Sequence, residues 1–225
     1  MVEKPAESNS NTSATPPTLT DYARKWGRYI VEPMARALAR LGIPPNVVTV
    51  SGFVLNIGVG IVLALGHIRW GGVCIILAAI FDALDGTLAR IVGRTSRFGA
   101  FLDSTMDRFS EAVIFLGLLV WYTRLGARQE ILLIYATIVG SQMVSYTRAR
   151  AEGLGLSCKV GILTRMERVI VLTAGLLLNQ VLIALWIMAI LTNLTALQRM
   201  IHVWQATRKE ERELSEQIAP EQKPL

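Results

Sequence analysis

The sequence is poor in cysteine, in histidine and, over long stretches, in charge, and each shortage excludes a class of site. Its two cysteines, Cys74 and Cys158, fall in an expected helix and an expected loop, where neither a disulfide nor a metal site is predicted. The two histidines, His67 and His202, are isolated near expected helix ends, so we interpret both as interfacial residues. Residues 1–18 lack the apolar run of a signal peptide, and their Ser, Thr and Pro content predicts a disordered tail.

The long uncharged segments define the fold class. Five segments contain no Asp, Glu, Lys or Arg: 41–68, 70–81, 112–123, 131–147 and 169–198. A membrane-spanning helix needs about 20 apolar residues, and the last segment with its flanks is long enough for two helices that turn near residues 179–180. We therefore predict an all-α integral membrane protein with six transmembrane helices within residues 42–205.

An amphipathic juxtamembrane helix is predicted at 19–41, before the first span. Basic residues interleave with apolar residues at helical spacing, which is typical of a helix lying on a membrane surface. The apolar residues are Tyr22, Trp26, Ile30, Met34 and Leu38. An ordinary surface helix is the alternative, and residues 206–225 predict a charged C-terminal tail.

Lysine and arginine are distributed unevenly between the two sides of the predicted bundle. They concentrate before the first span, after the second, around the loop after the fourth and after the sixth, whereas the other turns carry only Arg69, Arg124 and Arg128. The positive-inside rule then predicts a multi-pass plasma-membrane protein with both termini and the acidic residues on the cytoplasmic side. The net charge of +6 is accounted for by orientation and contact with anionic lipid, so no nucleic-acid partner is predicted.

Four aspartates stand where the sequence otherwise predicts membrane helices. Asp82 and Asp85 share one helix face with Gly86, Ala89 and Arg90, at i, i+3, i+4, i+7 and i+8. Either Gly86 leaves room for a ligand against the helix, or it allows close helix packing.

The next helix repeats the pattern, because Gly99, Asp103 and Asp107 recur every fourth residue. Two facing helices would direct four carboxylates into one volume, where they require cations. Oxygen ligands suit Mg²⁺ or Mn²⁺, and a two-metal site suits displacement at phosphorus. The alternative is a set of structural ion pairs with Arg90, Arg94, Arg97 and Arg108.

The spacing of these residues resembles the signature of the CDP-alcohol phosphotransferases. In this chain it reads Asp82-x2-Asp85-Gly86-x2-Ala89-Arg90-x8-Gly99-x3-Asp103-x3-Asp107, and the resemblance extends over about 19–202. It implies transfer of a phosphatidyl or similar group from a CDP-linked donor to an alcohol, with release of CMP. It also implies two Mg²⁺ or Mn²⁺ ions on Asp82, Asp85, Asp103 and Asp107, with Asp107 as general base.

The same resemblance implies a set of residues that bind the CDP-linked donor: Asn46, Thr49, Asp85, Gly86, Ala89, Arg90 and Ser96. Two of them have a simpler interpretation, because Asn46 and Ser96 could each be the N-cap of a helix. The family often forms homodimers, which the sequence by itself does not show.

Three further stretches resemble the inositol-phosphate branch of this family, the phosphatidylinositol phosphate synthases: GAFLDSTMDR (99–108), SYTRARAE (145–152) and TRMER (164–168). They imply that Arg148, Arg165 and Arg168 bind the acceptor's phosphate, which suits the planar guanidinium fork. Arg148 replaces the usual lysine and Thr164 the usual glutamate. The alternative for these arginines is contact with anionic lipid.

The resulting functional prediction is transfer of a phosphatidyl group from CDP-diacylglycerol to inositol 1-phosphate. Within the family, glycerol 3-phosphate as acceptor, an archaeal ether-lipid donor and CDP-inositol remain alternatives. Outside it, intramembrane prenyltransferases also hold Mg²⁺-diphosphate on aspartates, but they usually have more helices. A cation transporter is the non-enzyme alternative, and Arg90 and the arginine cluster argue against it, because fixed positive charge does not favour a cation path.

Overall fold

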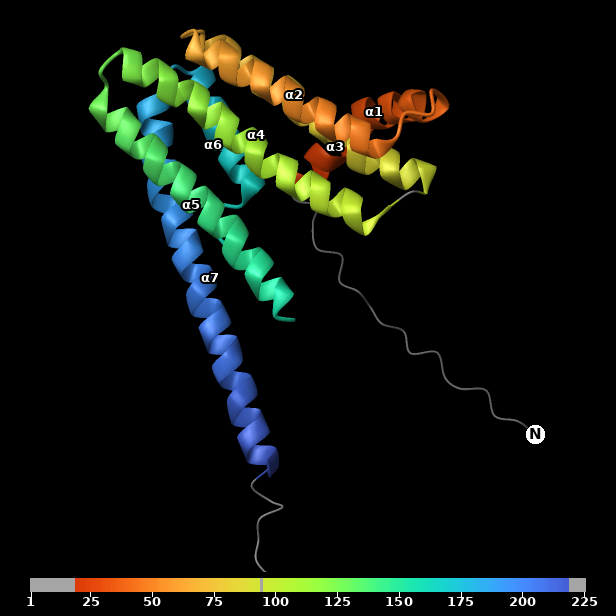
Figure 1. Cartoon of the computed structure of the whole chain (residues 1–225), viewed down its shortest axis with the longest axis vertical. Coiled ribbons are helices and arrows are strands. Elements are labelled where there is room, and N and C mark those ends of the chain that lie inside the picture. The colour runs from red at the N-terminus through yellow and green to blue at the C-terminus, as the bar shows by residue number, and fades with distance from the viewer. Residues whose placement is uncertain (1–18, 94, 219–225) are drawn as a thin grey trace, which may run out of the picture.

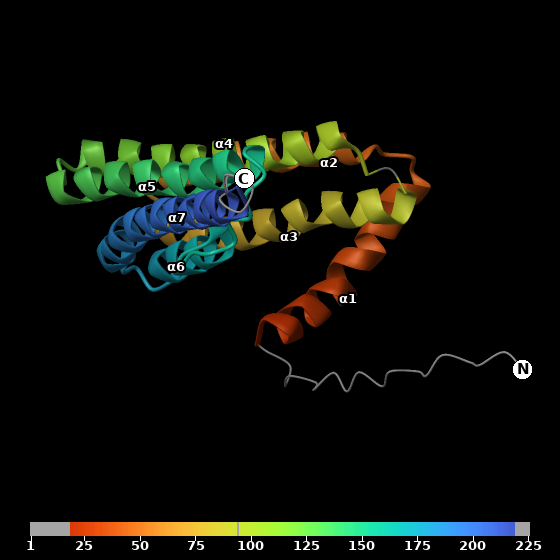
Figure 2. The ribbon, with the colours of Figure 1, turned by 90° about the horizontal axis from the view of Figure 1, so that it is seen from below.

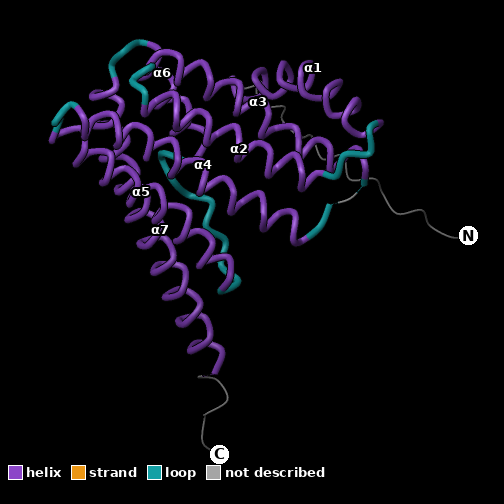
Figure 3. The backbone as a smooth tube through the Cα atoms, turned by 45° about the horizontal axis from the view of Figure 1, so that its top comes forward, coloured by secondary structure: helices purple, strands orange, loops and turns teal. Residues whose placement is uncertain are grey.

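The computed structural model describes residues 19–93 and 95–218, and all regular structure within these ranges is helical (Figure 1). The tube in Figure 3 shows helices joined by short loops. The helices are α1 (Leu19–Arg40), α2 (Pro45–Ala64), α3 (Ile68–Val92), α4 (Arg97–Arg124), α5 (Arg128–Gly153), α6 (Arg165–Leu177) and α7 (Val181–Ile218). The all-α prediction is confirmed, and the tail predicted at 1–18 lies outside the described residues.

Three of the described helices are long and apolar enough to cross a membrane, namely α2, α3 and α7. Helices α4 and α5 have sufficient length, with 28 and 26 residues, but both carry charged residues. Helix α6 has 13 residues, which corresponds to about 20 Å, whereas the hydrocarbon core is about 30 Å thick. The protein is therefore membrane-integral, while the count of six spans stays a prediction.

The helix boundaries largely follow the predicted ones. Gly93 adopts a left-handed conformation at the end of α3, with φ of 65°. The predicted turn near residues 179–180 is confirmed, and Asn179 has φ of 56° there. Helix α6 begins at Arg165, because residues 154–164 form the connection from α5.

The C-terminal boundary differs from the prediction. Helix α7 continues to Ile218, so residues 206–218 of the predicted charged tail are helical and continuous with the last predicted span. Lysine and glutamate favour helix, and Lys209 and Glu213 form an i,i+4 pair at 3.6 Å. Figure 1 shows this end of α7 projecting beyond the other helices.

Helix α1 packs on the bundle through a face that includes only Leu38 of the described residues in the predicted apolar stripe. Val31 and Ala35 are buried against Leu84 and Leu88 of α3, whereas Met34 is exposed. The helix is confirmed, and it lies obliquely beside α3 in Figure 2. The side chains of Tyr22, Trp26 and Ile30 lie outside the described residues.

Helix α2 lies against both α3 and α4, α5 runs along α7, and α6 packs between α3 and α7 (Figures 1 and 2). The approach of α2 to α4 is close enough to require glycine. A Cβ on Gly117 would lie 2.2 Å from the carbonyl oxygen of Gly60. Within the described residues, the backbones of α3 and α4 do not come into close contact. Their side chains therefore face each other across a space, and α2 closes one side of that space.

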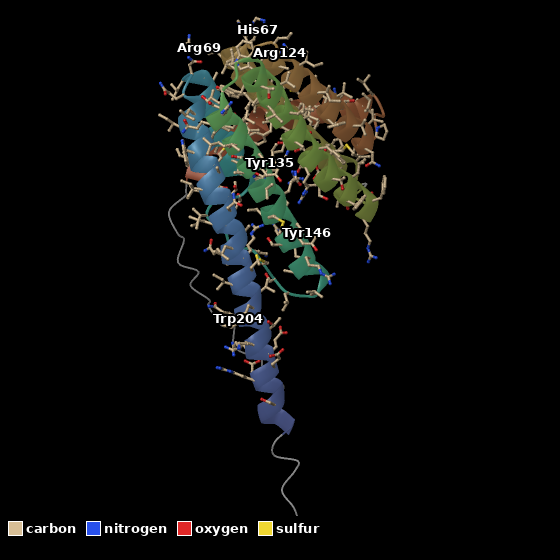
Figure 4. All side chains as sticks on the ribbon, turned by 60° about the vertical axis from the view of Figure 1, so that its left-hand side comes forward. His67, Arg69, Arg124, Tyr135, Tyr146 and Trp204 are labelled. Atoms are coloured by element: carbon tan, nitrogen blue, oxygen red, sulfur yellow. The ribbon has the colours of Figure 1, made fainter. Side chains whose placement is uncertain are left out.

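The charged residues of the predicted outer turns lie at one end of the bundle. Figure 4 shows His67, Arg69 and Arg124 together at this end, with Trp204 far away along α7. Arg124 donates from Nη1 to the carbonyl oxygen of Ala64 at 3.2 Å, which joins the end of α4 to the end of α2.

Candidate functional site

Helix α2 contacts one of the four aspartates, Asp85, through a side-chain hydrogen bond. Thr49 donates from Oγ1 to Asp85 Oδ2 at 2.7 Å, and the side chain of Asp85 is buried. A buried carboxylate needs such hydrogen bonds, because an unsatisfied charge in a low-dielectric interior is costly. Thr49 therefore fixes the orientation of Asp85, on the face of α3 that the sequence predicted.

Two further aspartates, one from each helix, meet a single arginine. Arg165 Nη2 lies 3.2 Å from Asp82 Oδ2 and 2.6 Å from Asp107 Oδ1. Positive charge between the two carboxylates offsets their repulsion. Helix α6 thus contributes to the acidic site through the first residue of its sequence.

The predicted alternative of ion pairs with neighbouring arginines is wrong for the residues that the structure describes. None of Arg90, Arg97 and Arg108 forms an ion pair with an aspartate there, and the side chain of Arg94 lies outside the described residues. Arg90 instead donates from Nε to the carbonyl oxygen of Gly86 at 3.0 Å, within its own helix.

The four aspartates suit divalent metal ions by their chemistry. Within 19–93 and 95–218 no three Asp, Glu, His or Cys side chains converge closely enough to hold an ion as they stand. The donor set of Asp82, Asp85, Asp103 and Asp107 is nevertheless oxygen-only, as Mg²⁺ and Mn²⁺ prefer. Arg165 provides positive charge between two of these carboxylates, which is the electrostatic condition that a metal would also meet.

The residues predicted to bind the donor lie around the open end of this site. A Cβ on Gly86 would meet no heavy atom within 4 Å, so the packing interpretation of this glycine is wrong and open space adjoins the helix. Arg90 is exposed and Ala89 is half-buried one turn further along the same face. Space for a ligand therefore exists beside Asp85.

Two predicted donor residues meet at the start of α4. Ser96 is the N-cap of α4, since its Oγ accepts from Gly99 N at 2.9 Å, and that prediction is confirmed. Asn46 is not an N-cap, because Pro44 precedes α2 and Pro45 opens it. Its Oδ1 instead lies 3.3 Å from the Cβ position of Gly99, which places α2 and α4 in contact at the mouth of the site.

The three predicted acceptor arginines line one cavity of about 200 Å³ together with Asp107. They come from α5 and α6, and Asp107 comes from α4. Arg148 also pairs with Glu152 at 2.8 Å. Their side chains thus converge on a site that reaches the acidic residues, which lipid anchoring alone would not require.

Three charged residues in the wall of this cavity were not predicted: Arg108, Glu111 and Arg199. Glu111 had a signal in the sequence, because it continues the four-residue repeat of Asp103 and Asp107. Arg199 had none, since it follows a long apolar segment as a single basic residue. It is buried, and its Nε donates to the carbonyl oxygen of Val160 at 2.8 Å.

A second and larger cavity, of about 360 Å³, adjoins the first. Asp82, Asp107, Arg165 and Arg168 line one part of it. The remainder is largely apolar: Ile75, Ala79, Ile114, Phe115, Leu172 and Met188. The charged residues therefore separate a polar cavity from an apolar one.

The comparisons with known proteins agree with this site. The family model described as CDP-alcohol phosphatidyltransferase matches residues 43–205. Phosphatidylinositol phosphate synthase of Mycobacteroides abscessus is 38% identical over 181 residues, which cover 76% of this chain and 82% of that protein. Archaetidylinositol phosphate synthase of Pyrococcus horikoshii is 39% identical over 171 residues, covering 76% and 88%.

Solved structures of Mycobacterium tuberculosis phosphatidylinositol phosphate synthase share the fold. The structure with CDP-DAG bound has a TM-score of 0.75 at 33% identity, covering 78% of this chain and 94% of that one. The structure with manganese and citrate has a TM-score of 0.73 at 33% identity, covering 76% and 88%.

Together with these matches, the all-helical membrane-integral fold and the aspartates of α3 and α4 place the chain in the class of membrane-embedded transferases of substituted phosphate groups. The chain belongs to the CDP-alcohol phosphatidyltransferase family and is a transferase of phospholipid biosynthesis.

Proposed function

We propose that this enzyme transfers a phosphatidyl group from CDP-diacylglycerol to inositol 1-phosphate and releases CMP. The observation that carries the proposal is the shared cavity of Arg148, Arg165, Arg168 and Asp107. A phosphorylated alcohol needs cationic groups for its phosphate and a base for its hydroxyl, and this cavity offers both. The relatives named phosphatidylinositol phosphate synthase support the same acceptor.

The donor would lie between α3 and α4, beside Gly86. Asn46, Thr49, Asp85, Ala89, Arg90 and Ser96 are the further residues that we assign to its cytidine and diphosphate. Two Mg²⁺ or Mn²⁺ ions on Asp82, Asp85, Asp103 and Asp107 would stabilise negative charge on the diphosphate and on the departing phosphate. The bound CDP-DAG of the Mycobacterium tuberculosis enzyme supports this class of donor.

In the reaction, the acceptor's hydroxyl oxygen bonds to the phosphorus that carries the lipid. The bond from that phosphorus to the oxygen shared with CMP breaks, and CMP leaves with the electron pair. Asp107 accepts the hydroxyl proton as attack proceeds. Arg148, Arg165 and Arg168 hold the acceptor's phosphate, so that its hydroxyl is directed at the phosphorus.

We also propose that α2 to α7 make six membrane crossings, with the site and both termini on the cytoplasmic side of the plasma membrane. The few charged residues near His67 and Arg124 at the opposite end support this orientation under the positive-inside rule (Figure 4). A homodimer is the assembly that the family resemblance implies.

The test is CMP release by purified protein with CDP-diacylglycerol and Mg²⁺ or Mn²⁺, with inositol 1-phosphate, free inositol and glycerol 3-phosphate supplied separately. We expect turnover with inositol 1-phosphate alone, and phosphatidylinositol phosphate as the lipid product by mass spectrometry. Turnover with glycerol 3-phosphate alone would show that glycerol 3-phosphate, and not inositol 1-phosphate, is the acceptor. Absence of release with every acceptor would overturn the assigned donor, which CDP-archaeol and CDP-inositol would then test.

A further inference from the structure

The most buried charged pair at the site joins α4 to α6. The side chain of Arg168 is 2% exposed and that of Glu111 is 17% exposed. Arg168 donates from Nε to Glu111 Oε1 at 2.7 Å and from Nη2 to Glu111 Oε2 at 2.9 Å. Two parallel bonds fix the plane of the guanidinium as well as its position.

This pairing occupies the Nε–Nη2 edge of the guanidinium and leaves Nη1 free of Glu111. Arginine has five N–H donors, of which these bonds use two. Within the described residues no acceptor is found for Nη1 of Arg168, and the residue lines the polar cavity. The remaining edge is therefore available to an anion in that cavity.

Glu111 also ties this arginine to the general base. It lies one helical turn after Asp107, on the same face of α4. Because both ends of the arrangement belong to one rigid helix, the spacing between the Arg168 fork and Asp107 is set by α4 and not by the loop before α6.

We propose that Glu111 is a positioning residue for the acceptor. It holds Arg168 so that the free edge of the guanidinium meets the acceptor's phosphate while Asp107 faces the attacking hydroxyl. The proposal rests on the proposed function, in which Arg168 binds that phosphate. The competing explanation is a purely structural ion pair between α4 and α6.

Charge alone predicts the opposite effect from orientation. Loss of the Glu111 charge makes the cavity more positive, which by itself would tighten phosphate binding. Loss of the second parallel bond lets the guanidinium of Arg168 rotate, which weakens its charge-assisted hydrogen bond to the phosphate. We expect orientation to dominate, because Arg168 is nearly fully buried and cannot find another acceptor by rotating into solvent.

The experiment measures the KM of both substrates, kcat and the unfolding temperature for Glu111→Gln and Glu111→Asp, and for the exchanged pair Glu111→Arg with Arg168→Glu. We expect Glu111→Gln to raise the acceptor KM about tenfold and the donor KM less than twofold. The exchanged pair should regain unfolding temperature without regaining the acceptor KM. Glu32→Gln, which removes an exposed pair with Arg36 on α1, is the matched control and should change neither KM.

An unchanged acceptor KM in Glu111→Gln would overturn the proposal, as would equal increases in both KM values that the exchanged pair reverses. The acceptor preference of the wild type tests the proposed function independently of the Glu111 variants. Should the wild type use glycerol 3-phosphate, the same variants are measured with that phosphate acceptor. Wild-type turnover of free inositol without any phosphate acceptor would overturn both.

Discussion

The acidic site and the basic cavity are built from the chain in different ways. The aspartates come from one stretch, 82–107, on two consecutive helices that α2 braces through Thr49. The arginines come mainly from α5, α6 and α7, over residues 148–199, with Arg108 from α4, and they converge only in three dimensions. The two regions meet where Arg165 pairs with Asp82 and Asp107. Helix α4 links the two regions, because it carries both Asp107, which we propose as the base, and Glu111, which pairs with Arg168.

The largest effect is expected at Asp107, our proposed base, where the acidic site and the basic cavity overlap. Asp107→Asn keeps the size of the side chain but cannot accept the hydroxyl proton, so turnover should fall by about 10³-fold. CDP-diacylglycerol binding should remain measurable, since Asp82, Asp85 and Asp103 are retained. CMP release and donor binding are the measurements. Turnover at the wild-type rate would remove Asp107 as the base.

A smaller effect is expected from disturbing one aspartate through α2. A Cβ on Gly52 would lie 2.7 Å from Asp82 Oδ1, so Gly52→Ala must displace that carboxylate. Misplacement of this kind should reduce turnover by about 10-fold or more and raise the Mn²⁺ concentration for half-maximal rate. Gly58→Ala is the matched control, because a Cβ there meets nothing within 4 Å. Equal rates in both variants would show that Asp82 tolerates displacement.

The smallest effect is expected at the hydrogen bond that orients Asp85. Thr49→Val removes the 2.7 Å bond to Asp85 Oδ2 but keeps the shape of the side chain. The donor KM should rise about fivefold and the acceptor KM should change little, since one net hydrogen bond contributes about 1 kcal/mol. Thr49→Ser keeps the hydroxyl and should behave as the wild type. A rise confined to the acceptor KM would contradict the assignment of Thr49 to donor binding.

The sequence predicted the acidic half of the site more completely than the basic half. Helical periodicity placed Asp82, Asp85, Asp103 and Asp107 on two faces, because that pattern is local to each helix. The pairing of Arg165 with two of these aspartates was not predicted, since it depends on how α6 packs beside α3.

The features of the fold that the sequence did not predict also depend on loops and on contacts between distant parts of the chain. The short length of α6 and the late end of α7 depend on where a loop stops and on local charge pairs, which apolar segments do not report. Arg199 entered the cavity wall because α7 packs along α5, a contact between distant parts of the chain. Glu111 was within reach of the periodicity argument, as the next residue in the series of Asp103 and Asp107.

The measurement that tests the account most directly is the pair of Michaelis constants for Arg165→Ala, with Arg165→Lys as the variant that keeps the charge. Arg165 contacts the acidic site and lines the basic cavity, so its removal reports which of the two it serves. We predict that the acceptor KM rises about tenfold or more and that the donor KM rises less, because we assign the lost guanidinium to the acceptor's phosphate. Equal increases in both constants would contradict a separate site for the acceptor's phosphate.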